Sequence, residues 1–281
     1  MSSECKKIAF FTYNLRGEYY LRLFDGFISQ LVNTKYRILL FMQEKNKDFD
    51  IIKIIKENDI DGAIIVNLHL DDKYIKIMIK KMKDTKFVFL DNEIFDKNVS
   101  SVLIDNKEAV NIALKYFLSL NHKKIACIRS GFGNEDSIRF RYYREFLKEN
   151  NIKYNENIVF NCFYSEADAC REIKRSFLSF KNQIDSIFCT NDNMALGAIK
   201  ALAEIGYDVP KDVSVIGFDD MRFSKFYNPS ITTIHNPIFE IGKTSISEVI
   251  RLLEENDIGR IILLKPSLIK RNSCQKILKQ N

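Results

Sequence analysis

The stretch from residue 186 to residue 220, SIFCTNDNMALGAIKALAEIGYDVPKDVSVIGFDD, decides the fold of this chain. It opens with the short apolar run Ser186–Thr190, continues with the amphipathic segment Asn193–Ile205, and closes with a second apolar run, Val213–Phe218. Continuous apolar runs of this length, separated by a helical segment, are typical of parallel strands that are buried on both faces. The stretch therefore predicts a strand, a helix and a strand of one parallel sheet, with polar residues following each strand.

The same alternation extends through the rest of the chain. In the first part we expect strands at 7–12, 36–41, 62–66 and 86–90, with helices at 19–32 and 72–83. After the apolar run 102–104 the pattern restarts, with helices at 107–120, 137–150 and 166–178 and strands at 124–128 and 157–161. The late segments 232–234, 237–255, 261–264 and 267–270 are too few for a third domain, and we interpret them as pieces that complete the two sheets. The prediction is an α/β fold of two similar, doubly wound, parallel-sheet lobes.

The composition is that of an ordinary globular protein, with 281 residues, 46% hydrophobic and 28% charged. The net charge of +6 is scattered along the chain, which does not indicate a nucleic-acid surface. No apolar run approaches the roughly 20 residues that span a bilayer, and the N-terminus has no apolar signal-peptide core. We therefore expect a cytoplasmic protein without a membrane partner.

The six cysteines are widely spaced and include no CxxC pair. Several lie in apolar strands, where a thiol packs as a small hydrophobic group. We expect free thiols in a reducing compartment rather than disulfides or a zinc site.

Polar and aromatic residues gather where the predicted strands end. They are Tyr19, Tyr20, Asn67, Asp91, Arg139, Asn191 and Asp219. In open parallel sheets ligands bind outside the carboxyl ends of the strands. Amides and carboxylates hydrogen-bond hydroxyl groups, aromatic rings stack on sugar or purine faces, and a guanidinium donates to neighbouring oxygens. These residues predict a site for a sugar or a nucleoside in the cleft between the lobes.

Structural roles compete with binding at several of these positions. Asn191 and Asp192 precede a helix, where either side chain could accept backbone N–H groups as an N-cap. Tyr19 and Tyr20 stand at a helix start and could belong to the core.

Of the possible functions, the sequence supports that of an enzyme least. The three histidines are isolated and belong to no HExxH or GxSxG motif. The sequence Ser130-Gly131-Phe132-Gly133-Asn134 has neither the third glycine of a dinucleotide fingerprint nor the Lys of a phosphate-binding P-loop, and a turn explains it. We expect no catalytic residue, cofactor or metal site.

One ordered set of motifs resembles a known family. It runs from Cys189-Thr190-Asn191-Asp192-Asn193-Met194-Ala195-Leu196-Gly197 through Val209-Pro210 and Asp212-Val213-Ser214-Val215 to Gly217-Phe218-Asp219-Asp220, with support from Tyr19-Tyr20, Asp105-Asn106, Thr232-Thr233-Ile234 and Arg271-Asn272-Ser273. Between about residues 7 and 273 the chain resembles the effector-binding domain of the lactose and galactose repressor (LacI/GalR) family, which is itself similar to periplasmic sugar-binding proteins.

The resemblance implies lobes of residues 1–103 with 236–265 and 104–235 with 266–281. It also implies an effector site made of Tyr19, Tyr20, Asn67, Asp91, Arg139, Phe163, Asn191, Asp219 and Asn236. In that site Arg139 and Asp219 clasp ligand hydroxyls, and Phe163 is a stacking wall.

The family's helix-turn-helix and hinge helix precede the first strand and have no counterpart in these residues. The resemblance therefore implies a homodimer that binds an effector, most simply a carbohydrate, closes its lobes on it, and controls the occupancy of operator DNA through an N-terminal domain outside these residues. The alternative is a free-standing or exported sugar-binding receptor of a transporter.

Overall fold

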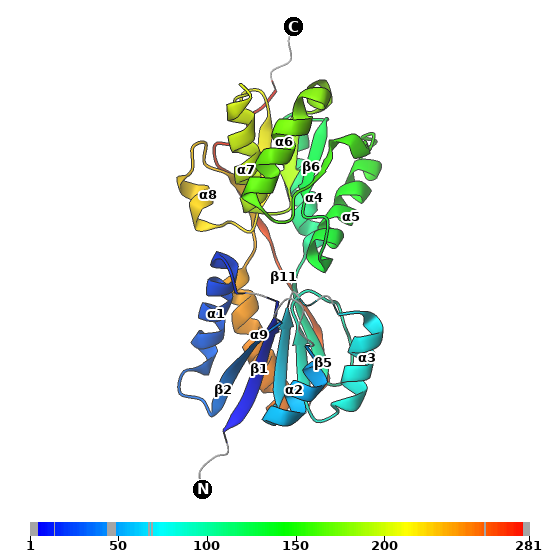
Figure 1. Cartoon of the computed structure of the whole chain (residues 1–281), viewed down its shortest axis with the longest axis vertical. Coiled ribbons are helices and arrows are strands. Elements are labelled where there is room, and N and C mark those ends of the chain that lie inside the picture. The colour runs from blue at the N-terminus through cyan, green and yellow to red at the C-terminus, as the bar shows by residue number, and fades with distance from the viewer. Residues whose placement is uncertain are drawn as a thin grey trace. The chain divides into compact units, whose positions relative to one another are not determined.

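The computed structural model describes residues 5–13, 15–43, 49–66, 68, 70–255 and 257–277. The chain divides into two compact units, and each unit is made of separate pieces of the sequence. The N-terminal unit comprises Met1–Ile104 and Pro237–Leu264, and the C-terminal unit comprises Asp105–Asn236 and Lys265–Asn281 (Figure 1).

The N-terminal unit is a parallel sheet covered by helices on both faces. Its elements are β1 (Lys6–Thr12), α1 (Glu18–Leu31), β2 (Tyr36–Met42), α2 (Ile51–Asn58), β3 (Gly62–Val66), α3 (Asp72–Lys81), β4 (Lys86–Phe89), β5 (Val99–Ile104), α9 (Ile238–Glu255) and β11 (Ile261–Leu264). The six strands follow the order β11-β5-β4-β3-β1-β2, and every neighbouring pair is parallel.

The C-terminal unit repeats this architecture. Its elements are α4 (Asn106–Ser119), β6 (Ile125–Arg129), α5 (Asn134–Glu149), β7 (Val159–Asn161), α6 (Glu166–Phe180), β8 (Ser186–Cys189), α7 (Asp192–Glu204), β9 (Ser214–Phe218), α8 (Arg222–Phe226), β10 (Thr232–His235) and β12 (Ser267–Ile269), with 3-10 turns at Glu156–Ile158 and Lys181–Gln183. The strand order is β12-β10-β9-β8-β6-β7. Both sheets confirm the predicted two-lobed α/β fold.

The strands alternate their side chains between two apolar layers. On β1, Phe10 contacts Phe24 and Phe27 of α1 at 5.3 and 5.2 Å between ring centroids. The next residue, Phe11, points to the opposite layer and stacks on Phe41 at 5.3 Å. A period of two along a strand produces this alternation, and the helices on each face bury both layers.

One strand departs from the predicted parallel arrangement. β12 pairs antiparallel with β10, and Ile234 lies opposite Leu268. β11 ends at Leu264 in one sheet and β12 begins at Ser267 in the other, so the chain changes sheets within two residues.

All six cysteines are free, as predicted, and Cys127, Cys162 and Cys189 are fully buried in the C-terminal unit. Among the helices that the structure describes, none is long and apolar enough to cross a membrane.

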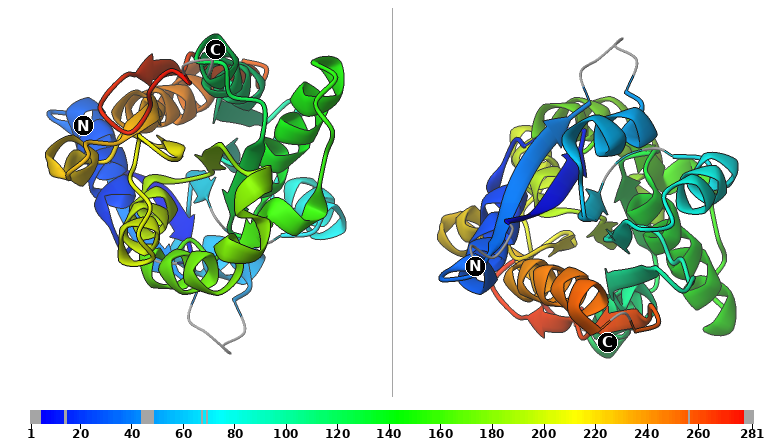
Figure 2. Two further views of the ribbon diagram at one scale, coloured as in Figure 1. Left: turned by 90° about the horizontal axis from the view of Figure 1, so that it is seen from above. Right: turned by 90° about the horizontal axis from the view of Figure 1, so that it is seen from below.

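Two glycines allow α1 and α9 to pack backbone against backbone (Figure 2, blue and orange helices). A Cβ atom on Gly242 would lie 2.2 Å from the carbonyl oxygen of Leu23. A Cβ atom on Gly26 would lie 2.2 Å from the carbonyl oxygen of Phe239. The obstructing atoms are backbone atoms, so they cannot move aside without separating the helices.

We therefore predict that Gly242→Ala destabilises the N-terminal unit, because an added methyl group forces α1 away from α9. The expected loss is about 2 kcal/mol or more in the free energy of unfolding, measured by urea denaturation. Lys243→Ala, at an exposed position of the same helix, is the control. Equal stability of the two variants would contradict the close crossing.

Candidate functional site

Those predicted site residues that the structure describes lie at or near the carboxyl edges of the two sheets. Within each sheet the parallel strands end on the same side, so the loops that follow them share one edge. Ligands of open parallel sheets bind at this edge.

At the edge of the N-terminal unit, Tyr20 is buried and lies beside the end of β1, where the Thr12 hydroxyl is 3.3 Å from its Oη. Tyr19 is half-buried and contacts Tyr20 edge to face at 5.3 Å between ring centroids. Asp91 follows β4 and is 5% exposed, which is unusual for a carboxylate. The predicted residue Asn67 lies outside the described residues.

At the edge of the C-terminal unit, a buried guanidinium organises the polar groups. Nε of Arg139 donates to Oδ1 of Asn106 at 3.0 Å, and Nη1 donates to the carbonyl oxygen of Thr190 at 2.8 Å. Nη2 donates to Oε2 of Glu135 at 2.7 Å, and the guanidinium carbon lies 3.7 Å from the centroid of the Phe218 ring. The side chain is thereby held in one orientation before any ligand binds.

Burial and charge act against each other on this ion pair. Burial alone would lower the pKa of Arg139, but the carboxylates of Glu135 and Asp219 outweigh it and raise the pKa above its ordinary value. Burial raises the pKa of Glu135, and the guanidinium opposes that rise. The guanidinium therefore stays charged.

A strained turn brings a second carboxylate to the guanidinium. Asp219 and Asp220 follow β9 with φ of 100° and 54°, a conformation that non-glycine residues rarely adopt. The Asp219 amide nitrogen donates to the carbonyl oxygen of Ile234, and Oδ1 of Asp219 lies 4.0 Å from Nη1 of Arg139. Strain of this kind concentrates at functional sites, where the surrounding structure holds it in place.

Asn236, which follows β10, completes this group. Its Nδ2 donates to Oδ1 of Asp219 at 3.1 Å. Its Oδ1 is buried and accepts no hydrogen bond from any residue that the structure describes. An unpaired buried acceptor costs stability, so this oxygen is a natural partner for a ligand hydroxyl. The structure thus brings together three predicted residues, Arg139, Asp219 and Asn236.

An aromatic surface lies beside the end of β7. Phe163 is 65% exposed and Phe132 is 40% exposed, and their ring centroids are 5.7 Å apart. The Phe163 amide nitrogen donates to the carbonyl oxygen of Ser130, which joins the two loops. Exposed rings of this kind can stack on the apolar face of a sugar or on a base.

Asn191 and Asp192 have structural roles. Oδ1 of Asn191 accepts from the amide nitrogen of Met194 at 2.8 Å and caps α7, so its oxygen is already engaged. Oδ2 of Asp192 accepts from the Met221 amide nitrogen and the Ser224 hydroxyl, both at 2.7 Å.

Asp192 is fully buried, and its Oδ1 also accepts from the Thr233 hydroxyl at 2.6 Å. Burial raises its pKa to about 7, although the hydroxyls of Thr233 and Ser224 counteract the rise. A Cβ atom on Gly217 would lie 2.1 Å from Oδ1, so the glycine makes room for this carboxylate. Asp192 ties α7 to the segment that carries Asp219.

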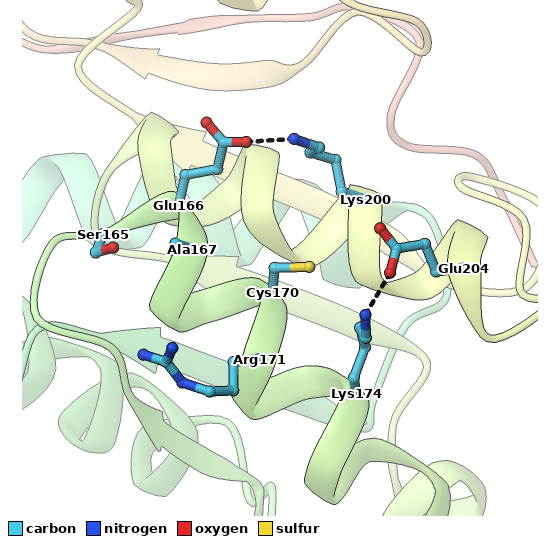
Figure 3. Close-up of a pocket in the computed structure, with 8 residues that line it drawn as sticks. All are labelled: Ser165, Glu166, Ala167, Cys170, Arg171, Lys174, Lys200 and Glu204. Atoms are coloured by element: carbon cyan, nitrogen blue, oxygen red, sulfur yellow. Dashed lines mark hydrogen bonds and ion pairs between the residues drawn. The ribbon is translucent and has the colours of Figure 1, made fainter.

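A separate recess lies on the helical face of the C-terminal unit, between α6 and α7 (Figure 3). Four of its charged side chains pair with one another, Lys200 with Glu166 at 2.6 Å and Lys174 with Glu204 at 2.5 Å, on either side of Cys170. The recess presents no polar group comparable to the buried Asn236 oxygen. In the described part of the chain, no group of three or more His, Cys, Asp or Glu could hold a metal ion.

Comparison with known proteins identifies the family. Residues 114–274 match the periplasmic binding protein-like domain. The transcriptional regulator MalR of Clostridium butyricum is 30% identical over 275 residues, covering 91% of this chain and 80% of MalR. The chain belongs to the LacI/GalR family of transcriptional regulators. It forms the effector-binding domain of such a regulator, as the motifs predicted.

Other LacI/GalR members agree with this assignment. The transcriptional repressor PurR of Vibrio vulnificus (strain CMCP6) is 26% identical over 265 residues, covering 92% of this chain and 78% of PurR. The fold matches a LacI-family regulator from Enterococcus faecium with bound ribose, with a TM-score of 0.84, 23% identity, and coverage of 97% of this chain and 100% of that one. It also matches the lac repressor dimer bound to operator and the anti-inducer ONPF, with a TM-score of 0.83, 20% identity, and coverage of 98% and 96%.

The sequence of this LacI/GalR domain left several site residues unpredicted. Glu135, Asn106 and the Asp136 carboxylate all hold the edge of the C-terminal sheet. Glu135 stands four residues before Arg139, a spacing that places two side chains on one helix face, so this pair could have been found. Asp192 could not, because its partners Ser224 and Thr233 are 32 and 41 residues away.

We predict that Asp192 makes the stability of the domain depend on pH. Its pKa is about 7 in the folded state, against an ordinary value of 3.8, so the folded state binds the proton more tightly. Stability should therefore fall as pH rises from about 4 through about 7 and level off near pH 8, by roughly 4 kcal/mol in total. Urea denaturation across this range measures it.

Asp192→Asn should remove this dependence, because an amide does not titrate. The control is Asp71→Asn, which replaces the cap of α3 with another good cap. If wild type and Asp192→Asn show parallel stability curves from pH 4 to pH 8, the prediction is wrong.

Proposed function

We propose that this domain binds a carbohydrate or a similar hydroxyl-rich effector, and that binding controls the occupancy of operator DNA by closing the two lobes on the ligand. It acts by binding rather than by catalysis, in the cytoplasm. The observation that carries the proposal is the group formed by Arg139, Asp219 and Asn236, which offers fixed donors and acceptors beside exposed aromatic rings.

The proposed contacts follow from the chemistry of each group. The guanidinium of Arg139 donates to ligand oxygens, whereas the Asp219 carboxylate and Oδ1 of Asn236 accept from ligand hydroxyls. Phe163 stacks on the ligand, and the Nδ2 group of Asn191 donates from the start of α7. We propose Tyr19, Tyr20, Asn67 and Asp91 as the binding residues of the N-terminal unit. Relatives described with bound ribose and with cellobiose support a sugar as the ligand.

A thermal-shift screen of sugars and nucleobases tests this function. With the compound that binds, Arg139→Gln and Asp219→Asn should each lower affinity about 100-fold, or roughly 2.7 kcal/mol, because each removes charge-assisted hydrogen bonds to the ligand. The ligand-induced rise in Tm, measured against each variant's own free form, should then disappear. Arg251→Gln, which breaks a buried ion pair with Glu248 in the N-terminal unit, is the matched control. If the ligand still raises the Tm of both site variants as much as that of the wild type, these residues do not form the binding site.

We also propose that the domain forms a homodimer and that α1 and β2 supply part of its interface. Leu21 and Ile28 expose apolar side chains seven residues apart on one face of α1, and Val32 exposes another at the C-cap of this helix. β2 is an edge strand of its sheet and exposes Leu40 and Met42. Contiguous exposed apolar side chains commonly mark association surfaces. The relative described as a lac repressor dimer supports this proposal.

Leu21→Glu combined with Ile28→Glu should shift the protein from dimer to monomer. In the dimer, each protomer would have to bury two unpaired carboxylates against the apolar surface of its partner. Sedimentation velocity at micromolar concentration measures the change. Ile77→Glu, on α3 of the same unit, should leave the dimer intact. A wild-type protein that sediments as a monomer would contradict the proposal.

A further inference from the structure

Two arginines at the edge of the C-terminal sheet are each paired closely with a carboxylate. Arg139 is paired with Glu135 at 2.7 Å, and Arg129 is paired with Asp136 at 2.7 Å. Asp219 lies 4.0 Å from Arg139, farther away than Glu135. The guanidinium charge of Arg139 that could attract an anion is thus already balanced by a carboxylate of the protein.

Asp136 accepts the backbone hydrogen bonds that an anion would otherwise accept at this edge. The loop Ser130–Gly133 leads into the N-terminus of α5, and backbone N–H groups at such a position attract negative charge. Oδ1 of Asp136 accepts from the Ser130 amide nitrogen at 2.8 Å, and its Oδ2 accepts from the Gly131 amide nitrogen at 3.2 Å. The protein's own carboxylate therefore takes the place of a bound phosphate.

The unused hydrogen-bond acceptors at the edge of the C-terminal sheet also favour ligands that donate hydrogen bonds. A guanidinium has five N–H donors. Three of those of Arg139 are used, by Asn106, Thr190 and Glu135. In contrast, Asp219 is a carboxylate that can only accept, and the buried Oδ1 of Asn236 accepts nothing from the described residues. Phosphates and carboxylates cannot donate to these oxygens, whereas hydroxyl groups can.

We propose that Glu135 sets the charge class of the effector: the site takes an unphosphorylated, uncharged polyol and rejects phosphorylated or carboxylated ligands. This inference rests on the proposed function, because it requires the effector to bind at this sheet edge. Glu135 acts as a specificity residue by neutralising Arg139, and removal of its charge takes away the carboxylate that lies nearer to the guanidinium, at 2.7 Å against 4.0 Å for Asp219.

The first test uses inorganic phosphate as the probe. Wild type should show no more stabilisation by phosphate than by chloride at equal ionic strength. Glu135→Gln, which keeps the shape of the side chain, should gain saturable stabilisation, with at least tenfold higher phosphate affinity, or about 1.4 kcal/mol. The double variant Glu135→Gln with Arg139→Gln should lose this gain.

Glu172→Gln is the matched control, because it frees the exposed Arg175 on α6 without creating a site, and it should gain nothing. Two results would overturn the proposal. One is phosphate binding to wild type that disappears in Arg139→Gln. The other is a folded Glu135→Gln that gains no phosphate affinity.

The second test needs no variant and compares matched ligands on wild type by calorimetry: ribose with ribose 5-phosphate, and glucose with glucose 6-phosphate. The neutral member of any pair that binds should bind at least tenfold more tightly. Tighter binding of a phosphorylated member would overturn the charge assignment while leaving the proposed function intact. If no neutral compound of the screen binds but the phosphate test succeeds, the proposed function fails and the charge assignment stands.

Discussion

Burial of both faces of each sheet restricts polar side chains to the ends of the strands or to positions with a buried partner. β3, β4, β5 and β9 are buried along their whole length, and helices cover the two faces of their sheets. A polar group in the middle of such a strand needs a hydrogen-bond partner, as Ser100 of β5 has in Glu248, because without one it costs a few kcal/mol. Because the strands run parallel, their polar ends collect at one edge, and the location of the site follows from the packing of the core.

The same constraint explains why the site is prepared before a ligand arrives. Arg139 is 5% exposed, and a charge so deeply placed must be paired and hydrogen-bonded. Its partners come from different elements: Asn106 from α4, Glu135 from its own helix α5, and Thr190 from the end of β8. The guanidinium is therefore fixed by the fold, and little side-chain entropy remains to be lost on binding.

Much of this arrangement could be predicted from the sequence, because periodicity and strand ends are local signals. The strands and most helices were expected within a few residues of their bounds. Arg139 and Asp219 were expected to meet, and they lie 4.0 Å apart. The burial of the Asp192 carboxylate was not predictable, since it depends on the hydroxyl groups of Ser224 and Thr233, which lie far away in the sequence. The short α8 was missed, because five residues carry too little pattern. The segment of β12 was expected at residues 267–270, but its antiparallel direction was not.

The interleaving of the two units along the chain has a consequence for synthesis on the ribosome. The N-terminal unit requires α9 and β11, and these follow the first strand by more than 200 residues because the segment Asp105–Asn236 comes between. At about 5–20 residues per second, this unit waits ten seconds or longer for its last helix and strand. During that interval the apolar surface of α1 that α9 later covers is open to water and to other nascent chains. The C-terminal unit, most of which is continuous, can assemble its sheet in the meantime and needs β12 alone to finish. The order of emergence thus leaves the first-synthesised unit incomplete for the longest time, which makes it the natural client for a chaperone.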